Sequence, residues 1–167
     1  MALLNILQFP DKRLKLKAEP VKSVDADIQK IIKDMFETMY EAQGVGLAAT
    51  QVNIQKRIVV MDVSRDESSP VALVNPVITA SEGSITWEEG CLSFPGVYAK
   101  VKRHDKITVE YLNEEGEKQT LTGSDLLGVC IQHEIDHLDG ITFYDHLSPL
   151  KKKMMEKKLA KIRERSL

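Results

Sequence analysis

The hydrophobic and polar positions of the chain divide it into a helical N-terminal part, a run of short strands and two helices near the C-terminus. After a stretch at residues 1–22 that is predicted to be irregular, Ser23 or Asp25 is a candidate N-cap for the first helix. The helix is predicted to end near Gln43, with Gly44 as its C-cap. Apolar side chains recur three or four positions apart and form one face of this helix, at Ile28, Ile31, Ile32, Met35 and Met39.

Short runs rich in β-branched residues occupy the middle of the chain, and residues that favour turns separate them. Residues 113–116 form one such turn, with the composition of a hairpin loop. We therefore expect a mostly antiparallel β region. Its predicted strands span residues 57–63, 71–74, 76–79, 82–87, 98–103, 106–112 and 118–121.

A second helix is predicted after Ser124, its candidate N-cap, and Gly140 suits its C-cap. Gly128 lies within it and costs about 1 kcal/mol relative to Ala, which indicates close packing against a neighbour. Because apolar residues cover most of its circumference, we expect this helix to be buried. Leu126, Cys130, His133 and His137 share one face of the helix. Leu127, Ile131 and Leu138 cover the adjacent face.

The last helix is predicted from Ser148 and Pro149, which suit an N-cap and a first helical position. Its apolar stripe is narrow and lies among many lysines. Helices that flank and follow a set of short strands indicate the α+β class. We therefore expect short antiparallel strands packed around a central helix, with one helix before them and one at the C-terminus.

Composition limits the function classes further. The 167 residues fit one domain over 1–167, and the formal net charge of −2 gives no general reason to expect nucleic acid or an anionic membrane as partner. No apolar run approaches the roughly 18 residues of a membrane span. The N-terminal residues lack the basic segment of a signal peptide, and two cysteines, Cys91 and Cys130, are too few for a disulfide framework. A cytoplasmic location is expected.

The candidate chemistry lies in the second helix, where His133 and His137 are four residues apart and Glu134 follows the first. Residues at i and i+4 lie on one helical face, so both imidazoles can reach one metal ion with the carboxylate beside it. The alternative is a pair of buried histidines satisfied by hydrogen bonds. Burying two imidazoles and a carboxylate without partners costs about 1–3 kcal/mol per group, which favours the metal site.

A catalytic metal site needs a third protein ligand and an open position. Large groups of zinc peptidases take this ligand from downstream, where the candidates here are Glu156 and His146, and Phe143 occupies the position of a third histidine. Upstream, Cys91 lies in a glycine-containing segment that we expect to be a structured loop, and it is the better candidate. Cys130 is expected to be an inert, small apolar residue.

Three separated segments resemble, in order and spacing, the signature motifs of the peptide deformylases. They are Gly-Val-Gly-Leu-Ala-Ala-Thr-Gln at 44–51, Glu-Gly-Cys-Leu-Ser at 89–93 and Gln-His-Glu-Ile-Asp-His at 132–137. Residues 9–14 are also similar, and the resemblance covers essentially the whole chain. These enzymes remove the formyl group from the N-terminal formyl-methionine of newly made proteins and release formate. The resemblance therefore implies the same activity here.

The resemblance also implies a role for each residue at the site. Metal-bound water would be the nucleophile and Glu134 the general base, and the side chain of Gln51 and the backbone N–H of Leu92 would stabilise the oxyanion. Family members prefer Fe²⁺ in the cell, and purified protein often holds Zn²⁺ or Ni²⁺, whereas the ligand types alone point to zinc first. The implied metal ligands are Cys91, His133 and His137.

The expected substrates are formyl-methionyl nascent peptides. The Val45–Gly46 backbone would pair with an extended peptide as an added strand, and an apolar pocket would hold the methionine side chain. Its candidate residues could also be ordinary core: Trp87, Leu126, Val129 and Cys130. Two positions depart from well-known enterobacterial members, with Tyr98 where Arg is common and Gln43 where Glu is frequent, and both bear on peptide preference.

The C-terminal residues and the site residues also bear on further partners and on other functions. The lysine-rich tail at 151–165 is either a solvated helix or a weak ribosome contact, since related enzymes use such a helix there. No membrane partner and no sequence-specific nucleic-acid binding are expected. The alternatives are a zinc peptidase that cleaves internal bonds, and an inactive relative that binds N-terminal peptides or the ribosome. The presence of Cys91 and of all the catalytic residues argues against both.

Overall fold

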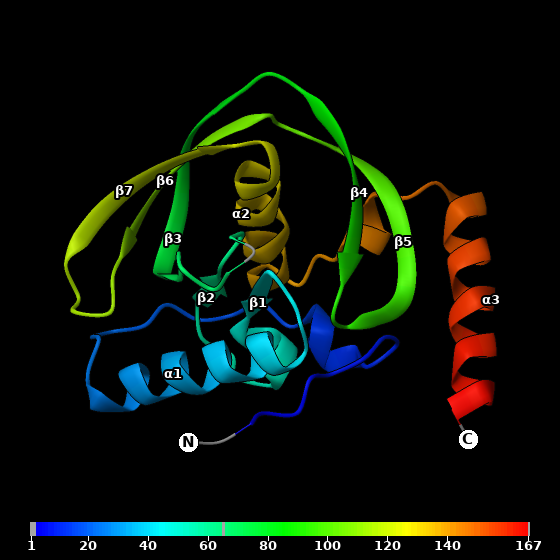
Figure 1. Ribbon diagram of the computed structural model, residues 1–167, viewed down its shortest axis with the longest axis horizontal. Helices are drawn as coiled ribbons and strands as arrows, with labels where there is room; N and C mark the ends of the chain where they lie inside the picture. The colour runs from blue at the N-terminus through cyan, green and yellow to red at the C-terminus, as the bar shows by residue number, and fades with distance from the viewer. Residues whose placement is uncertain (1–2, 65, 167) are drawn as a thin grey trace.

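The computed structural model describes residues 3–64 and 66–166, and Met1, Ala2, Arg65 and Leu167 lie outside this part. Strands curve around a central upright helix, with another helix beneath and a third at one edge (Figure 1). This arrangement confirms the α+β class. The elements are η1 (Lys12–Lys15), α1 (Ala26–Glu41), β1 (Gly46–Ala48), η2 (Ala49–Val52), β2 (Ile58–Met61), β3 (Val71–Glu82), β4 (Ile85–Cys91), β5 (Phe94–Arg103), β6 (Lys106–Leu112), β7 (Lys118–Ser124), α2 (Asp125–Leu138), η3 (Phe143–His146) and α3 (Pro149–Ser166).

The described strands form two antiparallel sheets. The larger has the order β1-β2-β3-β6-β7, and the smaller is the β4–β5 hairpin. Helix α2 contacts β1, β2, β6 and β7, and in Figure 1 it stands between the larger sheet and the hairpin. Since β1 is an edge strand of its sheet, only one of its sides pairs with another described strand.

Helix α1 follows the predicted stripe. The Asp25 side chain accepts a hydrogen bond from the N–H of Ile28, and the apolar face packs against the sheet. The prediction of Gly44 as C-cap is wrong, because the helix ends at Glu41 and Gln43 adopts the left-handed conformation (φ 59°). Gly44 instead avoids a steric clash, because a Cβ at this position would lie 2.7 Å from a methyl carbon of Leu92.

Several predicted strand boundaries are wrong. The predicted strands 71–74 and 76–79 are one strand, β3, with a bulge at Asn75, whose φ is 51°. Residues 82–87 divide between the end of β3 and the start of β4, because Gly83 turns the chain with a φ of 68°. Strand β5 begins at Phe94 rather than Tyr98, and the short strand β1 was not predicted.

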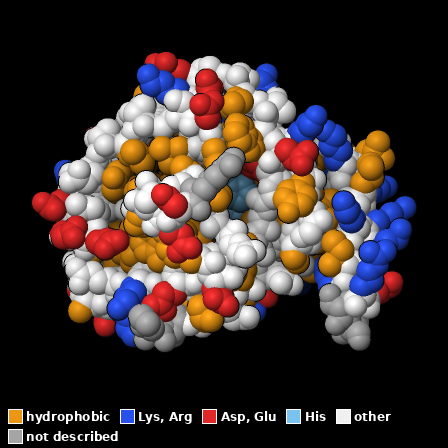
Figure 2. Space-filling model, viewed as in Figure 1, with side chains coloured by type: hydrophobic (Ala, Val, Ile, Leu, Met, Phe, Trp, Pro, Cys, Tyr) orange, Lys and Arg blue, Asp and Glu red, His pale blue; other side chains and the backbone are white. Residues whose placement is uncertain are grey.

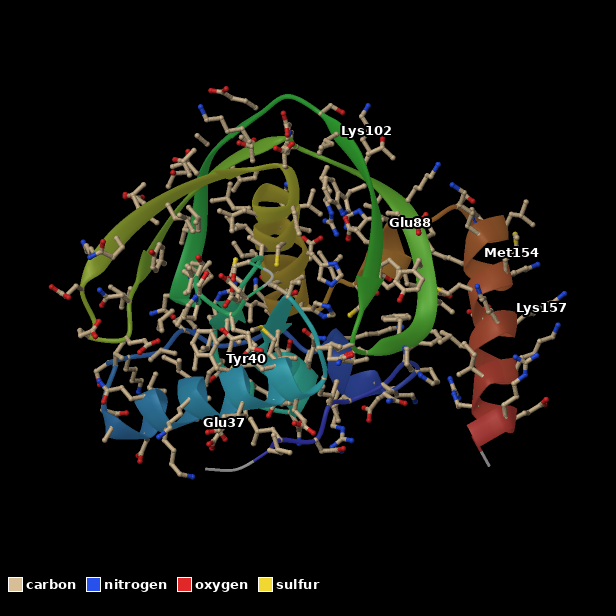
Figure 3. The ribbon with its side chains drawn as sticks, viewed as in Figure 1. Glu37, Tyr40, Glu88, Lys102, Met154 and Lys157 are labelled. Atoms are coloured by element: carbon tan, nitrogen blue, oxygen red, sulfur yellow. The ribbon has the colours of Figure 1, made fainter. Side chains whose placement is uncertain are left out.

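The predicted last helix is confirmed as α3, which packs on β5 through Met155 and Leu159. It stands at the edge of the molecule (Figure 1), and its Met154 and Lys157 side chains point away from the body (Figure 3). The helices described over 3–64 and 66–166 include none that is long and apolar enough to cross a membrane.

Candidate metal centre

Helix α2 carries three polar side chains into the core. His133, Glu134 and His137 are all buried, with exposed fractions of 6%, 4% and 0%. The helix lies close to the chain around it, as Gly128 predicts, because a Cβ at that position would be 2.7 Å from the carbonyl oxygen of Asp105. Ser124 is the N-cap residue by position, although its side chain makes no capping hydrogen bond.

Cys91 supplies a third donor to the same place. The ligand atoms of Cys91, His133 and His137 all lie within 4.8 Å of one another, and Cys91 Sγ is 3.4 Å from His137 Nε2. The prediction that Cys91 lies in a loop is wrong, because it is the last residue of β4 and pairs with Phe94 across the hairpin.

The downstream candidates for a third ligand are engaged elsewhere. Glu156 accepts a hydrogen bond from the Tyr144 hydroxyl, and His146 contacts the Asp136 carboxylate at 2.9 Å. Phe143 packs edge-on against Phe94 in an aromatic cluster. Among the described residues, the group that can hold a metal is therefore Cys91 with the two histidines of α2.

Two residues that the sequence reasoning missed orient the first histidine. Nδ1 of His133 lies 2.8 Å from Glu89 Oε1, and the buried Arg103 donates to both Glu89 oxygens at 2.8 and 2.9 Å. A carboxylate only accepts, so His133 Nδ1 carries the proton and Nε2 keeps its lone pair for a metal. Glu89 stands two residues before Cys91, but no local pattern links it to Arg103.

The charges at the site depend strongly on burial. Burial raises the pKa of the Glu134 carboxyl to about 7, although the nearby His133 opposes the shift. Burial alone would lower the pKa of His133, but Glu134 and the hydrogen bonds to Cys91 and Glu89 raise it well above its ordinary value. Burial and the charge of His133 lower the pKa of His137 well below its ordinary value. In the metal-free site His133 therefore favours a second proton, on Nε2, which a bound metal ion would replace, whereas His137 disfavours one.

These residues fit a bound transition metal. Within the part of the chain that the structure describes, His137 Nδ1 and Glu134 Oε1 are buried and have no hydrogen-bond partner. One thiolate and two imidazoles suit zinc, iron or nickel, and three protein ligands leave an open position. A cation at the centre would also offset the buried negative charge of Glu134 and of a Cys91 thiolate.

Gln51 lies beside the metal group, on η2. Its Oε1 accepts a hydrogen bond from the Ala48 N–H at 2.9 Å, which fixes the orientation of the amide. Its Nε2 therefore faces Ser93 Oγ at 3.1 Å and Cys91 Sγ at 3.5 Å. Leu92 stands between Cys91 and Ser93 in the chain. The structure thus brings the Gln51 amide to one side of the metal group.

A cavity of about 510 Å³ opens onto Glu134 and His133. Figure 2 shows a histidine in a hollow near the centre of this face, with hydrophobic side chains around it. A Cβ on Gly46 would lie 2.5 Å from a Glu134 oxygen, so only glycine lets the β1 backbone come this close. The lining includes every predicted pocket residue: Val45, Gly46, Trp87, Leu126, Val129 and Cys130.

Cys130 lies inside this cavity and Tyr98 lies at its mouth. Burial, together with Glu134, raises the pKa of the Cys130 thiol well above its ordinary value, so it stays protonated and apolar as predicted. Tyr98 is 65% exposed at the mouth of the cavity. Its ring covers Gly90, where a Cβ would lie 2.6 Å from a ring carbon. The cavity thus combines an apolar interior with an aromatic rim.

The family model for polypeptide deformylase matches residues 3–153. The chain is 56% identical to a peptide deformylase of Neisseria meningitidis, with 96% of each chain covered, and 53% identical to peptide deformylase 2 of Xanthomonas campestris, with 98% of each covered. Its structure is similar to a peptide deformylase from Legionella pneumophila (TM-score 0.96, 46% identity, 99% and 98% covered). It also resembles the enzyme from Ehrlichia chaffeensis in complex with actinonin (TM-score 0.92, 40% identity, 96% and 98% covered). The motif resemblance is confirmed: this chain belongs to the polypeptide deformylase family.

Proposed function

We propose that this protein is a metal-dependent hydrolase that removes the formyl group from the N-terminal formyl-methionine of newly made polypeptides. The products are formate and a free N-terminal amine. One observation carries the proposal: Cys91, His133 and His137 meet beside Glu134 at an apolar cavity, in a chain of the deformylase family. Residues 1–167 form one catalytic domain in this proposal.

The proposed metal ion is Fe²⁺, held by Cys91, His133 and His137, and Zn²⁺ or Ni²⁺ can take its place. The choice of iron rests on the family resemblance, while the donor set supports each of these ions. A divalent ion held by these three residues would lower the pKa of a bound water molecule toward neutrality and would so supply the nucleophile.

Glu134 is the proposed general base. It takes a proton from the attacking water and later delivers it to the leaving amine. A catalytic group that must accept and then donate a proton works best when its pKa lies near the working pH. Burial raises the pKa of Glu134 to about 7, which supports this double role.

Gln51 and Leu92 are the proposed oxyanion donors. The Gln51 amide nitrogen and the Leu92 N–H donate to the oxygen of the tetrahedral intermediate as negative charge develops on it. The hydrogen bond from Ala48 to Gln51 Oε1 supports this role, because it keeps the amide N–H groups directed to the site before substrate arrives. Loss of one such donor typically lowers the rate by about 10²–10³-fold.

The substrate peptide is proposed to extend β1 at its open edge. Backbone hydrogen bonds from Val45 and Gly46 give affinity without reading side chains, as an enzyme for many nascent chains requires. The methionine side chain enters the cavity among Leu126, Val129 and Cys130. Because such substrates arise at the ribosome, a cytoplasmic location follows from the proposed activity.

Helix α3 is proposed to make a weak ribosome contact through its lysine-rich outer face. Its exposed residues include Lys153 and Lys157, and Lys157 points away from the body (Figure 3). Removal of the residues after Leu150 should lower co-sedimentation with ribosomes at low salt. Unchanged co-sedimentation would contradict this part of the proposal.

The decisive assay is formate release from a formyl-methionyl peptide by protein that is prepared and loaded with Fe²⁺ without oxygen. Glu134→Gln should keep its metal and lose about 10²–10⁴-fold in kcat, since it removes the general base. Glu164→Gln makes the same chemical change on the exposed part of α3 and should retain wild-type rates. No formate release by fully metal-loaded wild-type protein would refute the proposed activity.

A further inference from the structure

A chain of polar contacts leads from the metal ligand His133 to the surface at His146. His133 Nδ1 contacts Glu89, and Arg103 holds Glu89 through its Nε and Nη2. The remaining Arg103 nitrogen, Nη1, donates to Asp136 Oδ2 at 2.6 Å. His146 Nε2 lies 2.9 Å from the same Asp136 oxygen and 3.4 Å from Arg103 Nη1. One carboxylate oxygen therefore joins the buried arginine to the surface histidine.

Burial decreases outward along this chain of contacts. The side chains of Glu89 and Arg103 are 3% and 4% exposed, that of Asp136 is 24% exposed and that of His146 is 38% exposed. Asp136 is thus the first member that can rotate into solvent. If it did so, Arg103 Nη1 would lose a charge-assisted hydrogen bond close to the core. Whatever holds Asp136 in place therefore also protects the orientation of Arg103.

His146 is built to hold Asp136. It is the last residue of η3, whose first residue, Phe143, is 1% exposed and packs edge-on against Phe94. The anchored turn fixes the backbone of His146 while its imidazole reaches α2. The ring nitrogen of His146 donates to Asp136 Oδ2, so the carboxylate has a second partner that opposes its rotation.

We propose that His146 is a positioning residue for the metal ligand His133, acting through Asp136, Arg103 and Glu89. This inference rests on the proposed metal site. The groups that hold the second nitrogen of a metal-bound histidine fix the orientation of the ring, and their loss typically lowers metal affinity or activity by about 10–100-fold. His146 acts three contacts beyond Glu89, so its effect should be smaller, about threefold to tenfold. It lies outside the lining of the substrate cavity, so kcat should fall while KM stays unchanged.

The test measures how fast a strong chelator removes the metal from fully loaded protein. His146→Ala should release metal about threefold to tenfold faster than wild type. His146→Gln keeps an N–H donor near the position of Nε2 and should release metal within twofold of the wild-type rate. With Co²⁺ in the site, the visible absorption bands should shift in His146→Ala and not in His146→Gln. A matched control, Tyr144→Phe, removes the hydrogen bond from η3 to Glu156 and should leave release and spectrum unchanged.

A double variant tests the route. Asp136→Asn should release metal faster than wild type, and adding His146→Ala to it should cause no further acceleration, because His146 acts only through that carboxylate. Equal release by wild type and His146→Ala, or additive effects of the two changes, would overturn the inference. Wild-type protein that binds no metal would instead refute the proposed function. If His146→Ala unfolds, His146→Phe, which keeps a ring but has no N–H donor, takes its place in the same comparison.

Discussion

Helices α2 and α3 lie near each other in the chain but have opposite surroundings. Most residues of α2 are buried, including a carboxylate and two imidazoles, whereas α3 buries only Met155 and Leu159 among its described side chains. Figure 1 shows α2 at the centre of the molecule and α3 at its edge. The two helices therefore place their ionisable residues in very different dielectric environments.

The difference shows that burial, more than residue identity, determines how strongly a charged side chain interacts with its neighbours here. The buried Arg103, which lies beside α2, has close partners in Glu89 and Asp136. The lysines of α3, such as Lys157 in Figure 3, extend into solvent, where screening makes their interactions weak. The low-dielectric interior around α2 is also what strengthens the electrostatics that catalysis needs.

The largest expected effect comes from removing an arginine beside each helix. Arg103→Ala leaves Glu89 buried without its partner and should lower the free energy of unfolding by about 3–5 kcal/mol. Arg163→Ala on α3 loses an exposed contact with the Phe9 carbonyl and should change it by at most about 0.5 kcal/mol. Chemical denaturation of both variants at equal metal content measures the difference. Similar losses in the two variants would show that burial does not control the cost.

The contrast between the helices was predictable from sequence, but the support of the metal site was not. The spacing of His133 and His137 on an apolar helix identifies both the buried helix and its chemistry. Arg103 ends a strand of alternating residues, where an arginine normally faces solvent. Its contact with Glu89 crosses the hairpin, and its contact with Asp136 spans 33 positions in the chain. The periodicity of neighbouring residues does not reveal contacts between residues so far apart in the chain.

Long-range contacts also explain the errors in the strand boundaries. Asn75 interrupts the apolar pattern, so the sequence predicts two strands there. The structure keeps one strand because the Asn75 amide pairs with both the N–H and the carbonyl of Val21, 54 positions away. The glycines and the proline on either side of Cys91, at Gly90, Pro95 and Gly96, likewise predict a loop there. Gly90 belongs to a strand whose partner residue, Tyr98, packs its ring over the glycine.

A smaller effect is expected from the buried carboxylate of α2, and it depends on pH. In the folded metal-free protein, burial raises the pKa of Glu134 from its ordinary 4.5 to about 7, so the folded state binds this proton more tightly than the unfolded chain. The resulting stability is complete below pH 4.5 and is lost as the pH rises through about 7. Relative to Glu134→Gln, the metal-free wild type should lose about 3 kcal/mol between these pH values.

Denaturation of the two metal-free proteins at pH values from 4 to 8 measures this loss. The comparison with Glu134→Gln removes the contributions of groups that both proteins share. A difference in stability that stays constant with pH would show that the interior around α2 does not disfavour the charged carboxylate. The contrast with the solvated charges of α3 would then be much weaker than the burial of Glu134 indicates.

The smallest expected effect comes from exchanging glycine and alanine, because the α2 position should prefer glycine and the α3 position alanine. Gly128→Ala in α2 improves helix propensity by about 1 kcal/mol, but its Cβ would lie 2.7 Å and 2.9 Å from the carbonyl oxygens of Asp105 and Gly123. Backbone atoms yield poorly, so overpacking of about 1–3 kcal/mol should outweigh that gain and lower Tm by a few degrees. Ala160→Gly, at an exposed position of α3, should also lower Tm, because there only propensity matters. Thermal unfolding of both variants and the wild type at equal metal content measures the changes in Tm. A higher Tm for Gly128→Ala than for the wild type would mean that α2 has more room than its contacts indicate.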